Sequence, residues 1–199
     1  MAHILPPPTN EANTISSPTN KHGRKFYHVL LDPRFDGETV ARYRWFMMLS
    51  HSVEGSSSGV DVVRKWILML WKQGQEDVVN DDDDDDGEVY LVVVSHYLDD
   101  HCHRGSVVQC GVDVPVLTVR GGAALVEGWK HFENVLVMPD VDLEGRVEEL
   151  WRGQGCDGMM TQVSGCYLPQ WLRVGRLGSG ERFPELPFAT LFAYDAGCV

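Results

Sequence analysis

A cluster of side chains able to bind a metal follows directly after an apolar run in this chain. The run at residues 89–94 is rich in valine and leucine, which is typical of a strand covered on both faces. Imidazole, thiolate and carboxylate groups follow it, and these are groups that zinc prefers as ligands. They belong to His96, Asp99, Asp100, His101, Cys102 and His103. The end of a rigid strand is a suitable place for ligands, so the segment predicts a metal site.

Two interpretations of this segment are open from the residues alone. His96 and Asp100 are four positions apart and His101 is adjacent, so a loop that turns into a helix would let these groups converge on one ion. Alternatively, Asp99 or Asp100 caps a helix that begins near His101, and the histidines are merely solvated. In either case we expect Cys102 to pack in the core, because a free cysteine commonly behaves as a small buried hydrophobe.

The elements that would position this segment alternate between strands and helices. Apolar runs bounded by turn residues predict strands at 24–32, 89–94, 113–119, 132–138, 159–163, 171–174 and 188–194. Helical spacing predicts helices at 39–49, 61–73, 122–129 and 143–151. In the helix at 61–73 we expect the core face to be the stripe of Val62, Trp66 and Leu70, widened by Val63, Ile67 and Met69. The glycine-rich segment 175–180 is expected to be a hairpin turn.

The segment 95–101, Ser-His-Tyr-Leu-Asp-Asp-His, resembles the His-x-His-x-Asp-His signature of the metallo-β-lactamase superfamily. The strand, helix and strand expected at 113–138 are similar in order to the αββα half of that superfamily. The Asp-His-Cys-His ending and the later Trp-Lys-His-Phe at 129–132 resemble a fungal branch of metallo-β-lactamase-like proteins. The resemblance implies a fold of the α+β or α/β class, an αββα sandwich of which this chain holds the N-terminal part.

The same resemblance implies roles for the residues of the segment. His96 would belong to a first metal site, and Asp100 and His101 to a second. Asp100 would also orient the metal-bound water, which makes it the candidate catalytic residue. His103 is a further candidate ligand, because Leu98 stands where the signature has its second histidine. The expected cofactor is therefore zinc, as one or two ions in an incomplete site.

Two residues outside the segment matter to this expectation. Asp32 resembles the strand-end aspartate that orients the metal loop in the superfamily, although it could equally be a turn residue. The superfamily supplies further ligands from later strands, whereas no histidine follows His131 here and Asp195 is the one candidate carboxylate.

The function expected from the resemblance is metal-dependent hydrolysis of a small-molecule substrate by a weakly active or inactive site. Bound zinc lowers the pKa of its water from about 15.7 to about 7, which makes hydroxide available at neutral pH. The alternative is a non-catalytic remnant, or the product of a truncated gene model, that acts at most as a binding or structural module. Ligand number distinguishes the two, since a catalytic zinc needs about three protein ligands and an open position.

Composition sets the remaining expectations. Residues 1–23 are expected to form a disordered tail, and 24–199 a partial domain with a disordered acidic insertion at 74–88. Six aspartates at 81–86 account for half of the net charge of −12, and no basic patch predicts nucleic-acid binding. Without an export signal or a membrane-spanning apolar run, we expect a cytoplasmic protein with reduced cysteines. A half-sandwich would leave a sheet face uncovered and the strand at 188–194 exposed or poorly anchored. We therefore expect that the chain forms a homodimer through the exposed sheet or needs the missing C-terminal half.

Overall fold

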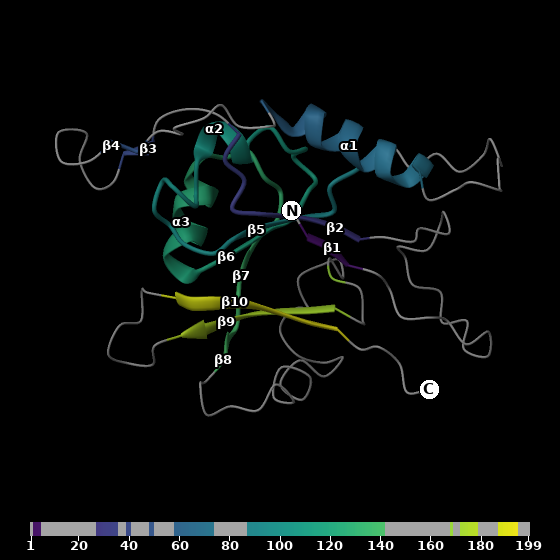
Figure 1. Ribbon diagram of the computed structural model, residues 1–199. Helices are drawn as coiled ribbons and strands as arrows, with labels where there is room; N and C mark the ends of the chain where they lie inside the picture. Colours follow the sequence, from purple (N-terminus) through teal and green to yellow (C-terminus); the bar gives the residue numbers. More distant parts are fainter. Residues whose placement is uncertain are drawn as a thin grey trace, which may run out of the picture.

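The computed structural model describes residues 2–4, 27–35, 39–40, 48–49, 58–73, 87–141, 168, 172–178 and 187–194 (Figure 1). The helices are α1 (Val60–Gln73), α2 (Arg104–Val107) and α3 (Arg120–Gly128). The strands are β1 (Ala2–Ile4), β2 (Tyr27–Leu31), β3 (Thr39–Val40), β4 (Met48–Leu49), β5 (Leu91–Val94), β6 (Val116–Thr118), β7 (Val135–Val137), β8 (Asp140–Val141), β9 (Leu172–Gly178) and β10 (Pro187–Tyr194).

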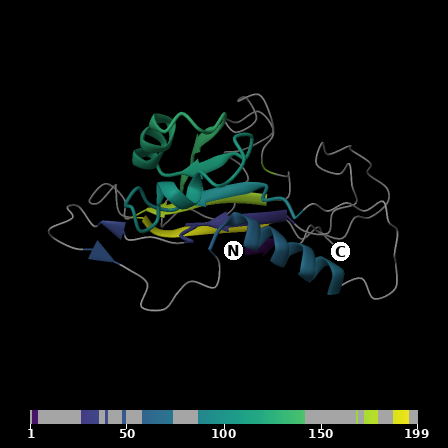
Figure 2. The ribbon, with the colours of Figure 1, turned by 90° about the horizontal axis from the view of Figure 1, so that it is seen from above.

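The main sheet has five strands in the order β1-β2-β5-β6-β7. The strands β2, β5, β6 and β7 are parallel, and β1 is antiparallel to β2. Parallel neighbours need crossover connections, and α1, α2 and α3 lie within the three crossovers. The helices lie on one side of the sheet, with α1 and α3 toward opposite edges of it (Figures 1 and 2). The mixed α/β class expected from the sequence is therefore confirmed.

One core lies between this sheet and the helices. Alternate residues of the strands face it, among them Leu30, Val92 and Val116. The helix α1 contributes Val60, Val63 and Ile67, of which Ile67 is 2% exposed. Of the expected face, Val63 and Ile67 are buried, whereas Met69 is 56% exposed. The central stripe of Val62, Trp66 and Leu70 is wrong as the core face, since Trp66 is 36% and Leu70 54% exposed. The helix carries apolar side chains around much of its circumference, and the sheet covers only one of its two apolar stripes.

A second core lies on the opposite face of the main sheet. There the alternate strand residues, Val29, Leu91, Val93 and Leu117, meet Leu172 and Val174 of β9, and all six are fully buried. The strand β9 belongs to a second sheet of order β10-β9-β8, which lies below the main sheet in Figure 1. The architecture of the described residues is thus three layers: helices, the main sheet and the second sheet.

This second sheet corrects the expectation of an uncovered sheet face. The strand at 188–194 is not poorly anchored, because β10 pairs with β9 from Pro187 to Tyr194 and Phe192 packs against the second core. The homodimer was expected to form through an uncovered sheet face, and β9 covers that face.

Other local expectations also differ from the structure. The helix expected at 39–49 is wrong at both ends, where β3 and β4 pair antiparallel with each other. The segment expected as a hairpin turn at 175–180 instead provides the end of β9 as far as Gly178. The strand β1 lies within the tail expected to be disordered. The helix at 143–151, the strand at 159–163 and the aspartates at 81–86 lie outside the described residues. Among the described helices, none is long and apolar enough to cross a bilayer.

Candidate active site

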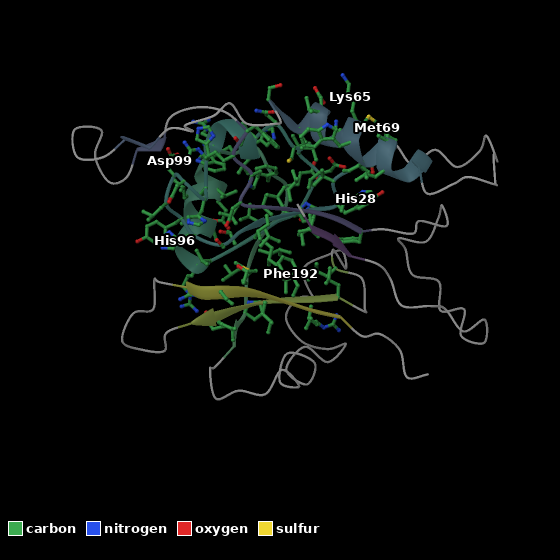
Figure 3. The ribbon with its side chains drawn as sticks, in the orientation of Figure 1. His28, Lys65, Met69, His96, Asp99 and Phe192 are labelled. Carbon is green, nitrogen blue, oxygen red and sulfur yellow. The ribbon has the colours of Figure 1, made fainter. Side chains whose placement is uncertain are left out.

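The candidate site lies at the carboxyl end of β5, in the loop of residues 95–103. Because β2 and β5 are adjacent and parallel, Asp32, which directly follows β2, lies beside the start of this loop. The Asp32 amide donates to the Val93 carbonyl oxygen at 2.8 Å. Figure 3 shows His96 and Asp99 toward the same end of the main sheet. The carboxyl ends of parallel strands are where ligands bind in open α/β sheets, so this location suits a functional site.

The loop begins with a turn and not with a helix. The amides of His101 and Cys102 both donate to the Leu98 carbonyl oxygen, at 2.9 and 2.7 Å. The helix α2 starts only at Arg104, with His103 at its N-cap position and without a side-chain capping bond. The interpretation in which Asp99 or Asp100 caps a helix beginning near His101 is therefore wrong.

Asp32 organises the loop through its carboxylate. Its Oδ1 accepts the Ser95 amide at 2.7 Å, and its Oδ2 accepts the Ser95 hydroxyl at 2.6 Å. The same Oδ2 lies 2.9 Å from His101 Nδ1, which donates its proton to it. The backbone of Asp32 has a φ of 45°, a left-handed conformation that aspartate and asparagine adopt more readily than other side chains. Asp32 thus binds both Ser95 and His101 through its carboxylate, and Ser95 is a partner that the sequence did not single out.

Electrostatics favour a charged Asp32 next to His101. Burial alone would raise the pKa of the Asp32 carboxyl, but the hydrogen bonds from His101 and Ser95 outweigh burial and hold that pKa below its ordinary value. The hydrogen bond to Asp32 raises the pKa of His101, and the negative charges of Asp32 and Asp100 act in the same direction. The pair is therefore a fixed carboxylate that holds an imidazole in one orientation.

The remaining ring nitrogen of His101 faces Asp100. The distance from His101 Nε2 to Asp100 Oδ2 is 3.8 Å. Two ligand atoms on one tetrahedral zinc ion lie about 3.3–3.4 Å apart, given bond lengths of about 2.0–2.1 Å. A shift of a few tenths of an ångström would bring these two atoms to that spacing. Histidine ligands commonly donate their other ring N–H to a carboxylate, as His101 does to Asp32. His101 and Asp100 therefore fit as two ligands of one ion.

His96 does not fit as a ligand through the nitrogen that the turn engages. Its Nδ1 accepts the Leu98 amide at 3.0 Å, which places the proton of the neutral ring on Nε2. The ring is 6% exposed, stacks on Tyr97 at 4.5 Å between centroids, and lies 5.9 Å from the His101 ring. In this arrangement His96 has a donor, and not a lone pair, at its second nitrogen.

His103 is turned toward α2. Its Nδ1 lies 2.9 Å from the hydroxyl of Ser106, which is buried and also accepts the Phe35 amide at 2.9 Å. Through Ser106 the contact links the start of α2 to the segment that follows β2. In this arrangement His103 stabilises the fold and does not face Asp100 or His101.

Cys102 packs as the sequence predicted. Its side chain is 2% exposed and belongs to the core beneath the helices. Burial, assisted by the nearby negative charges of Asp99 and Asp32, raises the pKa of the Cys102 thiol to about 12. A thiol of this kind stays protonated at neutral pH, which makes it a poor nucleophile and a poor ligand.

Of the four expected ligands, the structure therefore brings two together. Asp100 and His101 face each other, whereas His96 and His103 use ring nitrogens in other contacts. Among the residues described, no group of three His, Cys, Asp or Glu side chains converges as a metal site requires. The described residues thus do not fit a complete zinc site, and Asp195 lies outside them.

Comparison of the chain with protein-family models, with curated proteins and with solved structures finds no match.

Proposed function

We propose that this chain is a hydrolase-type domain related to the metallo-β-lactamase superfamily, with an incomplete metal site and weak or no activity. The observation that supports this proposal best is the bonding of Asp32, which fixes His101 through Nδ1 and leaves Nε2 directed toward Asp100. The Asp32 carboxylate accepts three hydrogen bonds, two from Ser95 and one from His101, and a carboxylate that accepts the ring N–H of a histidine is the usual partner of a histidine ligand.

Each residue of this arrangement has a distinct task in the proposal. His101 and Asp100 would hold a zinc ion, which when bound supplies a water of lowered pKa for hydrolysis of a small-molecule substrate. Asp32 keeps the proton of His101 on Nδ1, so that the lone pair stays on Nε2. Ser95 holds the Asp32 carboxylate in place at the end of β5.

A non-catalytic domain is the second candidate, and two observations favour it. Leu98 stands at the second histidine position of the signature, and the leucine side chain has no atom that can bind zinc. His96 accepts a bond from the Leu98 amide, which removes the lone pair of its Nδ1 from metal binding. Two ligands hold zinc weakly and leave a catalytic site short of the usual three.

Zinc binding separates both candidates from a protein that binds no metal, and hydrolysis then separates the two candidates from each other. After mild dialysis the purified protein is expected to retain less than one equivalent of zinc by elemental analysis, and calorimetry should show saturable binding. His101→Ala should abolish that binding, whereas His103→Ala, the matched control from the same loop, should leave it unchanged. Two tightly held equivalents would contradict the incomplete site, and no zinc under saturating conditions would contradict metal binding altogether.

The zinc-loaded protein is then assayed with a lactam, a thioester, a phosphodiester and a lactone. Hydrolysis that Asp100→Ala and His101→Ala abolish, and that Cys102→Ser leaves unchanged, would support the enzyme. Zinc binding without hydrolysis of any of the four would support the non-catalytic candidate.

A further inference from the structure

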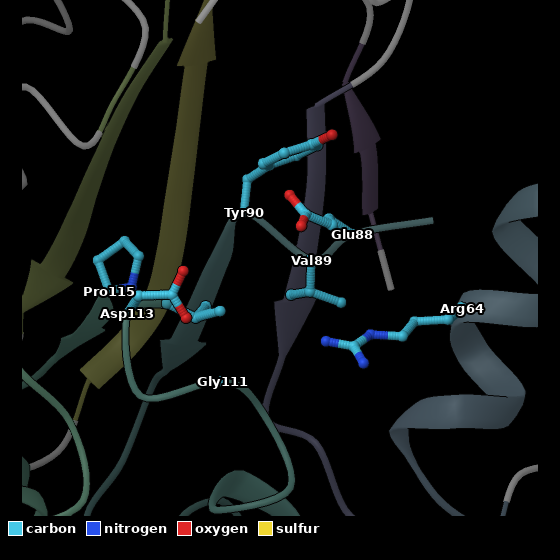
Figure 4. Close-up of a pocket in the computed structure, with 8 residues that line it drawn as sticks. Arg64, Glu88, Val89, Tyr90, Gly111, Asp113 and Pro115 are labelled. Atoms are coloured by element: carbon cyan, nitrogen blue, oxygen red, sulfur yellow. The ribbon is translucent and has the colours of Figure 1, made fainter. Parts of the chain in front are cut away.

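A pocket of about 190 Å³ lies at the amino-terminal ends of β5 and β6, away from the candidate active site. Glu88, Val89 and Tyr90 line it just before β5, and Asp113 and Pro115 line it just before β6. Arg64 of α1 closes it from the helix side (Figure 4). The loop of residues 95–103 lies at the other end of β5, so the two sites are separated by the length of that strand.

The walls of this pocket are held in place by the fold. The Tyr90 amide donates to the His28 carbonyl oxygen at 3.0 Å, and the Tyr90 ring stacks on Tyr27 at 5.3 Å between centroids. The Val60 amide at the start of α1 donates to Gln109 Oε1 at 3.1 Å, which ties the helix to the loop below it. These contacts fix the strand β5 and the helix α1, which form two sides of the pocket, while Glu88 and Asp113 are exposed side chains at its rim.

Arg64 offers hydrogen-bond donors to this space. Its Nη1 lies 3.8 Å from Asp61 Oδ1, too far for a hydrogen bond, and the side chain of Asp61 is 83% exposed. The Arg64 side chain is 38% exposed, and Figure 4 shows its guanidinium on the side of the pocket formed by α1. Its outer N–H groups can therefore donate to a ligand oxygen in the pocket. A carboxylate is the group that a guanidinium recognises best, through two parallel N–H···O bonds.

The opposite wall has the opposite charge. Figure 4 shows the Asp113 carboxylate facing the pocket from the side away from Arg64. A β-carbon on Gly111 would lie 2.6 Å from Asp113 Oδ1, so this carboxylate sits directly over a glycine that leaves room for it. With Glu88 also in the lining, the pocket carries two carboxylates and one guanidinium.

This charge pattern selects among ligands. A simple anion would pair with Arg64 but would meet the two carboxylates, and a simple cation would pair with a carboxylate but would meet the guanidinium of Arg64. A molecule with a carboxylate at one end and an ammonium group at the other satisfies both walls. The volume is below the range of about 300–1,000 Å³ that holds drug-sized ligands, so the molecule must be small. We propose that this pocket binds a small zwitterion of the α-amino acid class, with its carboxylate on Arg64 and its ammonium group on Asp113.

The test compares three matched compounds: L-leucine, 4-methylpentanoate, which lacks the ammonium group, and 3-methylbutylamine, which lacks the carboxylate. Each is titrated into ¹⁵N-labelled full-length protein while the amide signals of Gly111 and Val114 are followed. The Gly128 amide, on α3 and outside the pocket, is the internal reference. We expect saturable shifts at the two pocket amides, with L-leucine binding at least about tenfold more tightly than either partial compound, because each of these lacks one charge-assisted pair.

Variants assign the two ends of the ligand. Arg64→Gln and Asp113→Asn should each weaken L-leucine binding about tenfold or more. Lys65→Gln, the matched control from the next and exposed position of α1, should bind as the wild type does. Equal binding of all three compounds, undiminished binding by Arg64→Gln, or the absence of saturable shifts in the wild type would overturn the proposal. The comparison of compounds on the wild-type protein decides it even if a variant fails to fold.

Discussion

Replacement of Asp32 by asparagine is the sharpest test of the arrangement at the end of β5. Asparagine is close in shape and also adopts the left-handed backbone, so the φ of 45° at this position is preserved. An oxygen at Oδ1 still accepts the Ser95 amide. An NH₂ group replaces Oδ2, however, and it faces two donors, the Ser95 hydroxyl and His101 Nδ1.

The expected loss follows from those two contacts. Hydrogen bonds to a charged group contribute about 1.5–3 kcal/mol each. The hydroxyl of Ser95 can rotate to recover part of its bond, and the His101 side chain is 42% exposed, so solvent screens the second bond. We therefore expect the free energy of unfolding to fall by roughly 2–3 kcal/mol, which lowers the Tm by about 4–12 °C for a domain of this size. Ser95→Ala, which removes only the hydroxyl bond, should cost about 1 kcal/mol.

The loss should depend on pH in a definite way. The pKa of Asp32 is lowered from 3.8 by folding, so its contribution is present above pH 3.8 and is lost as the pH falls through the folded pKa. The pKa of His101 is raised from 6.5, so its contribution is present below pH 6.5 and is lost as the pH rises through the folded pKa. The difference in stability between wild type and Asp32→Asn should therefore be largest between pH 3.8 and 6.5.

Urea unfolding across that pH range, with NMR titration of the His101 ring, measures both effects. In Asp32→Asn the pKa of His101 should fall, because the hydrogen bond to Asp32 is the main cause of its elevation. Asp61→Asn, on the exposed start of α1, is the matched control and should change stability by less than about 0.5 kcal/mol. An unchanged His101 pKa together with wild-type stability in Asp32→Asn would refute the hydrogen-bonded arrangement.

Three further predictions concern packing and can be checked by unfolding and by chemical labelling. Ile67→Ala should cost about 2–5 kcal/mol in urea unfolding, and Leu70→Ala on the exposed face of α1 less than about 0.5 kcal/mol; equal effects would mean that the core face of α1 is assigned wrongly. Gly87→Ala should destabilise by more than about 1 kcal/mol, because Gly87 has a φ of 69° and a β-carbon would lie 2.6 Å from a backbone oxygen, whereas Gly128→Ala meets nothing and should be neutral or stabilising. Iodoacetamide at pH 8 should label Cys102 far more slowly in the native protein than in urea, because burial raises the pKa of that thiol to about 12, and equal rates would contradict its burial.

The central strands and the helix after them could be predicted from the sequence because their signals are local. A parallel strand buried on both faces leaves a continuous apolar run, and β5 and β6 both lie within such runs. The face of α1 could not be predicted in the same way, since both of its apolar stripes have helical spacing. The helix expected at 39–49 also fitted helical spacing, but there the pairing of β3 with β4 determines the observed structure.

The sequence predicted where the candidate site lies, at the end of β5. It did not predict which side chains bind one another there. Asp32 and Ser95 are 63 residues apart, and only the parallel pairing of β2 with β5 brings them together. A single serine after a strand carries no spacing signal, so its part in holding Asp32 was missed. The spacing of His96 predicted a metal ligand. Its Nδ1, however, accepts a hydrogen bond from the Leu98 amide, and this bond depends on a turn geometry that the sequence does not reveal.

The position of β5 has a consequence for how the molecule opens. This strand has a hydrogen-bonded neighbour on each edge, β2 and β6, and a core on each face. Its backbone amides can exchange with solvent only when both cores separate, so Val92 and Val93 should be among the slowest to exchange hydrogen for deuterium. The loop at 95–103 continues directly from this strand, so the amides of its first residues should also exchange slowly. The amide of Leu98, at the exposed tip of the loop, can exchange quickly. Amide exchange along residues 91–101 should therefore rise steeply over a few positions, from global to local opening.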